Sequence, residues 1–420
     1  MIFYNAAKKL KEFFVPRNRQ LLLFGLVHIA ILFIWLNYSQ FEIRIHPDVE
    51  LYFEYAQQMF SGNLPYRDFS VEYPPLALLF LLIPRLFSSN LAGYADGFAV
   101  LMLAFDMLGL FFISRISSNL KLGHFTTLAI YTFSFFILGD IVINRFDVIP
   151  AVLSLGAIYY YTERKYKYAW FVLALGVLTK LYPAIIAPLF AIHFIQIRQW
   201  KPLIKGVAVF VVTGLIGVVP FLAASPGGFW EFINFHSGRG LQLESGYASL
   251  LMLGDMLGLT DVEIVRSYSS VDIWAPASDF LVAASSFITI GAILGCYWFY
   301  YRNVVNGRQG NAGLVGYTLG ILAILLVTTK VFSTQFVIWL YPVIPLIGNH
   351  MRNPAWITFG VIALLSQYIY PFNYGQLMDF EQPAVIFLIL RNLLVFTLGV
   401  LVIYAPSGFR VVKNSSDQLR

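Results

Sequence analysis

Long apolar stretches separated by short polar segments dominate the chain. The first runs from Leu21 to Trp35 and follows a basic segment. A helix needs about 20 mostly apolar residues to cross a bilayer. We therefore expect further membrane helices near residues 74–87, 97–115, 124–143, 147–161, 168–195, 205–224, 277–301, 312–329, 332–349, 355–372 and 384–404.

Several of these stretches do not have the length of a single span. The one at 168–195 is long and contains Lys180-Leu181-Tyr182-Pro183, so it is either one broken helix or two short ones. Those at 74–87 and 147–161 are short for a full crossing. The pattern predicts an all-α, polytopic transmembrane bundle of about 11 to 13 helices.

Composition supports a membrane protein and excludes several other classes. Hydrophobic residues make up 59% of the chain and charged residues 12%, against about 25% charged in soluble domains. This excludes disordered, collagen-like, coiled-coil and disulfide-rich proteins. The net charge of +6 comes from short basic clusters between apolar runs, typical of cytoplasmic loops, so we expect no nucleic-acid partner.

The order of the segments predicts an orientation in the cell membrane. Asn37-Tyr38-Ser39-Gln40 is a poor cleavage site, so we interpret the first apolar run as a membrane helix with a cytoplasmic N-terminus. The chain, 1–420, is then a single membrane domain with two polar stretches. Residues 39–73 form the first external loop and 225–276 the second polar loop. Because much of the acidic inventory lies there, we expect the polar chemistry there.

The first external loop contains a short amphipathic pattern. Apolar and polar residues recur on opposite sides at helical spacing, which favours a helix lying in the membrane interface. Gly62-Asn63 is expected to end it, and Pro74-Pro75 to begin the next helix. The apolar side holds Leu51, Tyr52, Tyr55, Met59 and Phe60, and the polar side holds Glu50, Glu54, Gln57 and Gln58.

Acidic residues in this loop have two interpretations. Asp48, at the start of the helix, is either an N-cap or a general base at the membrane surface. Asp68 and Glu72 are either solvated loop acids or ligands of a donor or an acceptor.

Short motifs along the chain resemble those of the GT-C superfamily of membrane glycosyltransferases. In the first loop they are Asp48…Tyr52…Tyr55-Ala56, Gly62…Pro65-Tyr66 and Tyr73-Pro74-Pro75. Later ones are Arg145-Phe146-Asp147, Lys180-Leu181-Tyr182-Pro183, Lys330 and Gln335…Trp339-Leu340-Tyr341-Pro342. More narrowly the chain resembles glycosyltransferase family 87, the polyprenyl-phosphate-mannose-dependent mannosyltransferases, and is similar to the catalytic subunit of GPI mannosyltransferase I.

The resemblance implies a bundle of GT-C type and a specific activity. The catalytic aspartate of the first external loop would be Asp48. The enzyme would move a hexose, mannose by resemblance, from a polyprenyl-phosphate donor to a lipid-linked or glycan acceptor, inverting the anomeric centre on the non-cytoplasmic face. Expected partners are that donor, the acceptor and membrane lipids, without a cofactor. The acceptor is not specified.

An inverting transfer from a lipid phosphate needs one base and several cations. The base deprotonates the acceptor hydroxyl, while cations hold the charge of the leaving phosphate. Candidate cations are Arg145, Lys180, His236, Arg239 and Lys330. The alternatives are that Arg145 and Asp147 pair with each other, that the lysines extend to the interface, and that His236 to Gly240 is an ordinary turn.

Other candidate ligands carry hydrogen-bonding groups or sugar-stacking rings. They are Glu50, Tyr52, Tyr66, Asp68, Glu72, Tyr73, Asp147 and Gln335. No His-x-x-His or Glu-x-x-His motif occurs, so we predict no metal site, although the Asp48-x-Glu50 pair leaves a divalent ion open.

A transporter or lipid flippase is the main alternative function. Helix breaks and charges at membrane depth also occur in transporters. Transporters usually show repeated halves, and the sequence shows none. A non-catalytic relative that scaffolds other membrane enzymes is a third possibility.

Overall fold

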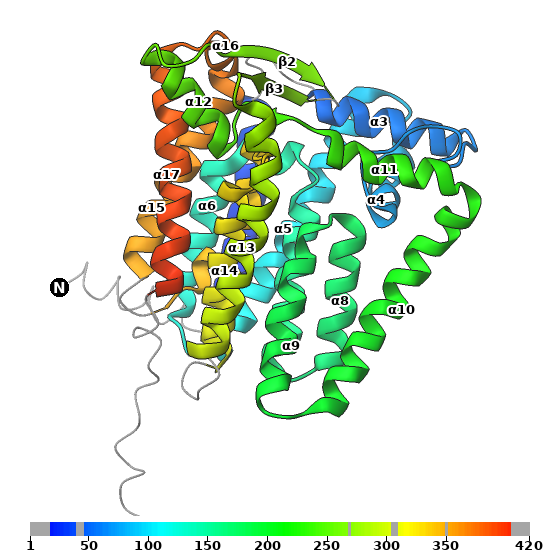
Figure 1. Ribbon diagram of the computed structural model, residues 1–420. Helices are drawn as coiled ribbons and strands as arrows, with labels where there is room; N and C mark the ends of the chain where they lie inside the picture. Colours follow the sequence, from blue (N-terminus) through cyan, green and yellow to red (C-terminus); the bar gives the residue numbers. More distant parts are fainter. Residues whose placement is uncertain (1–16, 39–45, 268–269, 304–309, 349–351, 405–420) are drawn as a thin grey trace, which may run out of the picture. The chain divides into compact units, whose positions relative to one another are not determined.

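The computed structural model confirms an all-α, multi-pass membrane protein (Figure 1). It describes residues 17–38, 46–267, 270–303, 310–348 and 352–404. In this part of the chain, eight helical segments are long and apolar enough to cross a membrane. They are α2 (Arg17–Tyr38), α5 (Leu91–Asn119), α6 (His124–Asn144), α10 (Trp200–Ala224), α13 (Ser278–Asn303), α14 (Gly310–Thr328), α15 (Arg352–Gln367) with the π-helical turn η5 (Tyr368–Phe372), and α17 (Gln382–Tyr404).

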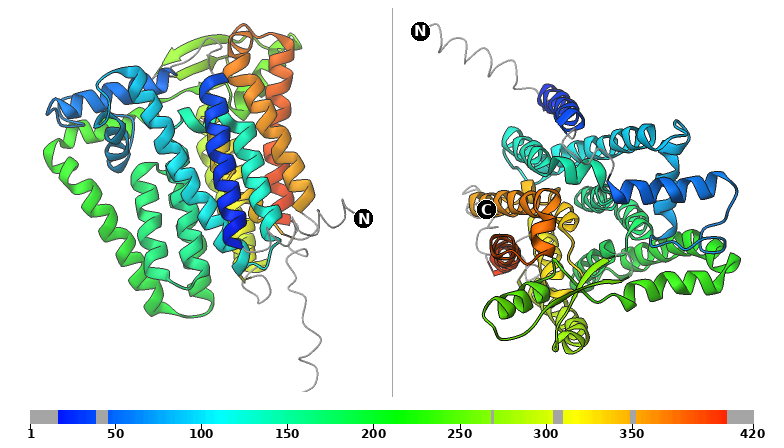
Figure 2. Two further views of the ribbon diagram at one scale, coloured as in Figure 1. Left: turned by 180° about the vertical axis from the view of Figure 1, so that it is seen from behind. Right: turned by 90° about the horizontal axis from the view of Figure 1, so that it is seen from above.

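The chain divides into two compact units, each with its own packing. The first comprises Met1–Pro183 and Val209–Asn234, and the second comprises Ala184–Ala208 and Phe235–Arg420. In the first unit α2 packs against α5 and α6, and Figure 2 shows α2 in blue running alongside α6. The remaining helices that begin there are α3 (Pro47–Phe60), α4 (Pro75–Arg85), α7 (Val148–Thr162), α8 (Tyr166–Thr179) and α11 (Pro226–Gly238).

The amphipathic helix predicted between the first two apolar stretches forms in the structure. It is α3, and its buried side comprises Val49, Tyr52, Phe53, Tyr55 and Ala56. Tyr52 and Tyr55 were predicted on this side, whereas Phe60, which was also predicted there, is 56% exposed. It ends at Phe60, and Gly62 adopts a φ of +90°, a left-handed conformation that glycine reaches without steric cost. Pro75 starts α4, where a missing amide hydrogen costs nothing. Residues 39–45 of the predicted loop lie outside the described residues.

In the second unit, α17 packs against α14, α15 and α12 (Gly246–Met256). The polar loop predicted at 225–276 contains helical segments and also a small antiparallel sheet in the order β1-β3-β2, which apolar periodicity did not predict. Its strands are β1 (Leu241–Gln242), β2 (Glu263–Ser267) and β3 (Ser270–Trp274). Leu241 and Ile264 both lie opposite Ile273 in the register.

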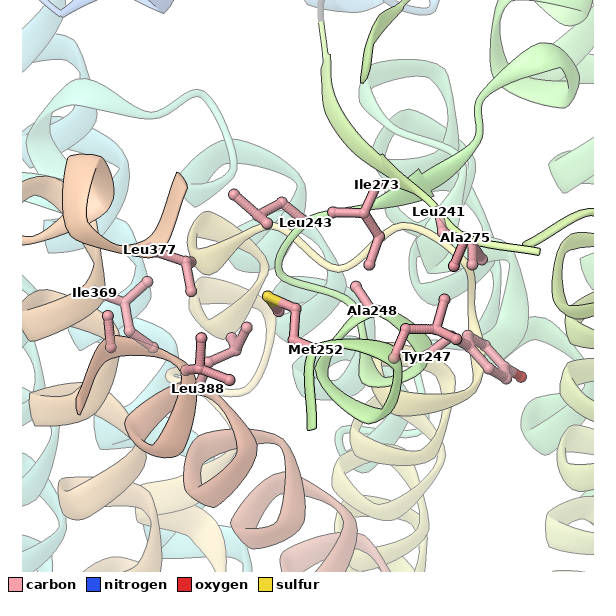
Figure 3. Packing of buried hydrophobic residues seen from close by; sticks show 13 residues of the cluster. Leu241, Leu243, Tyr247, Ala248, Met252, Ile273, Ala275, Ile369, Leu377 and Leu388 are labelled. Atoms are coloured by element: carbon pink, nitrogen blue, oxygen red, sulfur yellow. The ribbon is translucent and has the colours of Figure 1, made fainter. Parts of the chain in front are cut away.

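An apolar core joins this sheet to the helices of the second unit. Figure 3 shows Leu243 and Ile273 near Met252 of α12, with Leu377 of α16 (Tyr374–Met378) and Leu388 of α17 in the same cluster. All five side chains are buried. The sheet is therefore held by hydrophobic contacts as well as by its backbone hydrogen bonds.

Two predicted spans differ from a single regular helix. The stretch at 168–195 forms two short helices, as one alternative had it: α8 ends at Thr179, and the 3₁₀ turn η1 (Tyr182–Ile186) precedes α9 (Ala187–Gln196). The span predicted at 332–349 is wrong. Its described residues form two short 3₁₀ turns, η2 (Thr334–Trp339) and η3 (Ile344–Leu346), because Pro342 and Pro345 interrupt regular helical hydrogen bonding.

Candidate active site

The start of α3 places Asp48 in the first helical turn. The N-cap residue is His46, whose Nδ1 lies 3.3 Å from the backbone nitrogen of Asp48. The interpretation of Asp48 as the N-cap is therefore wrong. Asp48 and Glu50 both lie in the first turn, where the helix dipole favours negative charge.

Asp48 forms an ion pair with Arg145, which lies between α6 and α7. The guanidinium Nη1 contacts the Asp48 carboxylate, and Nη2 lies 2.9 Å from Nε2 of His46. The Arg145 side chain is 9% exposed and that of Asp48 is 30% exposed. A neighbouring cation favours the ionised form of a carboxyl group. The site thus presents an accessible carboxylate supported by a buried positive charge.

A second ion pair lies two residues further along the chain. Asp147 is 1% exposed and accepts a 2.6 Å hydrogen bond from Nζ of Lys180. Lys180 follows α8, where the extended backbone ends the helix. Arg145 and Asp147, for which mutual pairing was one alternative, therefore each pair with a residue from another segment.

Two tyrosine side chains, one from α3 and one from the segment before α4, pack beside the residues that form these ion pairs. The Tyr73 hydroxyl donates to the Tyr52 hydroxyl at 3.3 Å, and both rings contact Phe146, which stands between Arg145 and Asp147. Burial raises the pKa of Tyr52 and Tyr73. Both phenols therefore stay protonated and can act as hydrogen-bond donors at neutral pH.

Tyr66, the remaining tyrosine candidate of this loop, packs against α10 and α11. Tyr66 is buried among the rings of Phe221, Phe229 and Phe232, and its hydroxyl donates to the backbone oxygen of Tyr73 at 2.5 Å.

The acidic candidates of the loop have local roles in the structure. Asp68 pairs with Arg67 and accepts from the backbone nitrogen of Leu64 at 2.7 Å, which closes a local turn. Glu50 is exposed, and half-buried Glu72 lies near Tyr55. Burial raises the pKa of Tyr55, and the negative charge of Glu72 raises it further.

The remaining predicted cations belong to the second unit. His236 lies in the last turn of α11, and Lys330 donates to the carbonyl oxygens of Ser237 at 2.8 Å and Arg239 at 2.5 Å. A cation suits these carbonyls because they end a helix. Burial lowers the pKa of Lys330, while the nearby Asp272 charge raises it and Arg239 lowers it.

A buried polar network lies beside the motif that begins at Gln335 in the second unit. Glu244 accepts from the backbone nitrogen of Thr334 at 2.8 Å and pairs with Arg391 of α17 at 3.2 Å. Arg391 also donates to Asn392 at 2.9 Å and stacks over Phe332. Gln335 follows Thr334 directly. In the described part of the chain, its side-chain oxygen is buried without a hydrogen-bond partner.

Sequence reasoning missed several of these residues. His46 precedes the predicted helix by one residue and was not singled out. Arg391 lies within the apolar stretch 384–404 and pairs with Glu244. His28 lies within the first apolar run and Asp106 within the stretch 97–115, and these two side chains form a fully buried pair with each other. An ionisable residue inside an apolar stretch is a signal that could have identified Arg391, His28 and Asp106.

No metal site emerges among the residues that the structure describes, since no three His, Cys, Asp or Glu side chains gather in a way that could hold an ion. Within the Asp-x-Glu pair, Asp48 contacts Arg145 and Glu50 points to an exposed position.

Comparisons with known proteins identify the family. The profile of glycosyltransferase family 87 matches residues 71–329, which is more than half of the chain and includes Arg145, Asp147 and Lys180 but not Asp48. The crystal structure of ArnT from Cupriavidus metallidurans in the apo state is similar at 14% identity and a TM-score of 0.47, covering 91% of this chain and 77% of that one. Among curated protein sequences no match was found. The chain belongs to glycosyltransferase family 87.

Proposed function

We propose that the protein transfers a hexose, with mannose the expected sugar, from a polyprenyl-phosphate donor to a lipid-linked or glycan acceptor on the non-cytoplasmic face. Membership of the family supports glycosyl transfer as the reaction, and the membrane helices support lipid-linked molecules as its substrates. Nucleotide sugars are not present outside the cytoplasm, so a lipid-linked donor fits a site on that side. The observation that carries the proposal is the accessible Asp48 carboxylate paired with Arg145.

Asp48 is proposed as the general base of an inverting reaction. Its carboxylate takes the proton of the acceptor hydroxyl as the acceptor oxygen attacks the anomeric carbon from the face opposite the phosphate. The bond between the anomeric carbon and the phosphate oxygen breaks, and the lipid phosphate leaves with the electron pair. One carboxylate suffices for this reaction.

Accessibility favours Asp48 over the neighbouring acid. Asp147 is 1% exposed and its Oδ1 accepts from Lys180, whereas 30% of the Asp48 side chain is exposed. A general base must come within hydrogen-bonding distance of the proton that it removes. Asp147 instead neutralises and orients Lys180.

Arg145 and Lys180 are proposed to stabilise the leaving phosphate. Both are held by carboxylates in the same region of the first unit, so their side chains are ordered before substrate binds. Charge-assisted hydrogen bonds to phosphate oxygens are among the stronger ones in proteins. Groups organised in advance stabilise a developing charge without further reorganisation.

The experiment is a transfer assay with purified protein and three radiolabelled donors: polyprenyl-phosphate mannose, polyprenyl-phosphate glucose and GDP-mannose. A lipid extract from cells that lack the protein serves as acceptor. We expect label in a glycolipid from polyprenyl-phosphate mannose, with the anomeric configuration inverted by NMR. Label from GDP-mannose alone, or movement of the lipid donor across vesicle membranes without any glycosidic product, would overturn the proposal.

A further inference from the structure

His46 contacts both members of the proposed catalytic ion pair. Its Nε2 lies 2.9 Å from Nη2 of Arg145, and its Nδ1 lies 3.3 Å from the backbone nitrogen of Asp48. The side chain is buried, at 3% exposure. One imidazole thus lies beside the backbone of Asp48 and beside the guanidinium that contacts the Asp48 carboxylate.

The two contacts compete for one lone pair. A neutral imidazole has a single unprotonated nitrogen, and both Arg145 and the Asp48 amide offer only donors to it. The Arg145 contact is shorter and involves a charged donor, so it is the stronger of the two. This assigns the lone pair to Nε2.

Protonation of Nε2 would remove the acceptor that the His46 ring offers to Nη2 of Arg145. Among the described residues, the charged groups identified near the ring are Arg145 from the segment before α7 and Asp48 on its own helix. Burial, and then the positive charge of Arg145, lowers the pKa of His46 to about 2. The imidazole is therefore neutral throughout the physiological range.

We propose that His46 is a positioning residue whose unprotonated imidazole holds the guanidinium of Arg145 against the carboxylate of Asp48. The inference rests on the proposed function, in which Asp48 is the base. In this account the imidazole acts by limiting the rotamers of Arg145, which keeps the positive charge at a fixed place beside the carboxylate. The alternative is that His46 serves only as the N-cap of α3.

Two substitutions separate the two roles. In His46→Gln the amide oxygen takes the place of Nε2 and can still accept from Arg145. In His46→Asn it takes the place of Nδ1 and can still cap the helix, but it does not reach Arg145. His46→Ala removes both contacts, and Glu54→Gln, an exposed change on the same helix, is the control.

Transfer from polyprenyl-phosphate mannose is measured for each variant across a pH series. We expect His46→Gln to stay within about threefold of the wild type, and His46→Asn and His46→Ala to lose about 10- to 100-fold in kcat/KM. The acidic limb of the rate profile should move to higher pH in the last two, because a displaced cation no longer favours the ionised base. Full activity in His46→Asn or His46→Ala, or loss of it in a folded His46→Gln, would overturn the inference.

A donor-independent measurement separates failure of the inference from failure of the proposed function. The unfolding temperatures of His46→Asn, Arg145→Gln and the double variant are compared with that of the wild type. Contacting residues give a double variant that is less destabilised than the sum of the single ones. Additive effects would contradict the inference, even if the wild type transfers no sugar from the chosen donor.

Discussion

Lys180 and Asp147 form an ion pair with Nζ 2.6 Å from Oδ1, although 33 residues separate them in the sequence. Helices α7 and α8 pack against each other and are joined by a short turn, so the residue before α7 meets the residue after α8. Two short sequence motifs, each weak alone, therefore lie at one place. Because Asp147 lies two residues after Arg145, one short segment before α7 holds a partner of Lys180 and a partner of Asp48.

Replacing Lys180 by Met should reduce both stability and transfer. Asp147 would keep a buried charge without this partner, which we expect to cost about 2–4 kcal/mol of unfolding free energy. The phosphate would lose a cation, so kcat should fall. The double variant Lys180→Met with Asp147→Asn should recover most of the unfolding temperature but not the activity. Wild-type turnover in the double variant would contradict a role for Lys180 in phosphate stabilisation.

Gly228 of α11 allows a close approach to the segment between α3 and α4. A β-carbon there would collide with the backbone oxygen of Tyr66, whereas at Gly227 nothing lies within 4 Å. We predict that Gly228→Ala costs about 1–3 kcal/mol, since backbone must move to relieve the overlap. Gly227→Ala should be neutral or slightly stabilising, because alanine favours a helix. Thermal unfolding of the two variants in the same detergent tests this; equal unfolding temperatures would refute the close contact.

Arg391 should be among the most sensitive positions in the second unit. It is fully buried in α17, pairs with Glu244 and donates to the Glu244 backbone oxygen at 2.6 Å. Arg391→Met leaves the Glu244 carboxylate buried without that cation, for an expected loss of about 3–5 kcal/mol. Glu263→Gln, an exposed change on β2, is the matched control. If both variants unfold at the wild-type temperature, the network contributes no measurable stability.

Stability should fall on acidification because of His46. Its pKa is lowered in the folded protein from 6.5 to about 2, so between these values only the unfolded chain binds the proton. The contribution is complete above pH 6.5 and decreases by up to about 1.4 kcal/mol for each pH unit below it. Comparing unfolding temperatures at pH 7 and pH 5 for the wild type and His46→Gln checks this. An equal decrease in both proteins would exclude His46 as the source.

Apolar run length and helical spacing were sufficient to predict the class of fold and the amphipathic helix. The hydrophobic side of α3, its glycine end and the proline start of α4 follow from local propensity, which acts within a few residues. The break at Lys180 is likewise local. The turns at 334–346 were predicted as a span because apolar content does not distinguish a membrane helix from buried irregular backbone.

The partners of the charged residues could not be predicted from the sequence. Asp48 pairs with Arg145 at a separation of 97 residues, and Glu244 pairs with Arg391 at a separation of 147 residues. Such pairs depend on which helices pack together, and a single sequence does not specify this. The place of His46 at the N-cap position of α3 was also not predicted, since histidine is not among the usual N-cap residues.

In the proposed mechanism the Asp48 carboxylate removes the proton of the acceptor hydroxyl. The most direct measurement is the single-turnover rate of sugar transfer by purified Asp48→Asn, with Glu54→Gln as control and thermal unfolding to verify folding. We predict a loss of about 10²- to 10⁴-fold in Asp48→Asn, the usual contribution of a general base, and a wild-type rate in Glu54→Gln. A folded Asp48→Asn protein that transfers the sugar at the wild-type rate would contradict the claim.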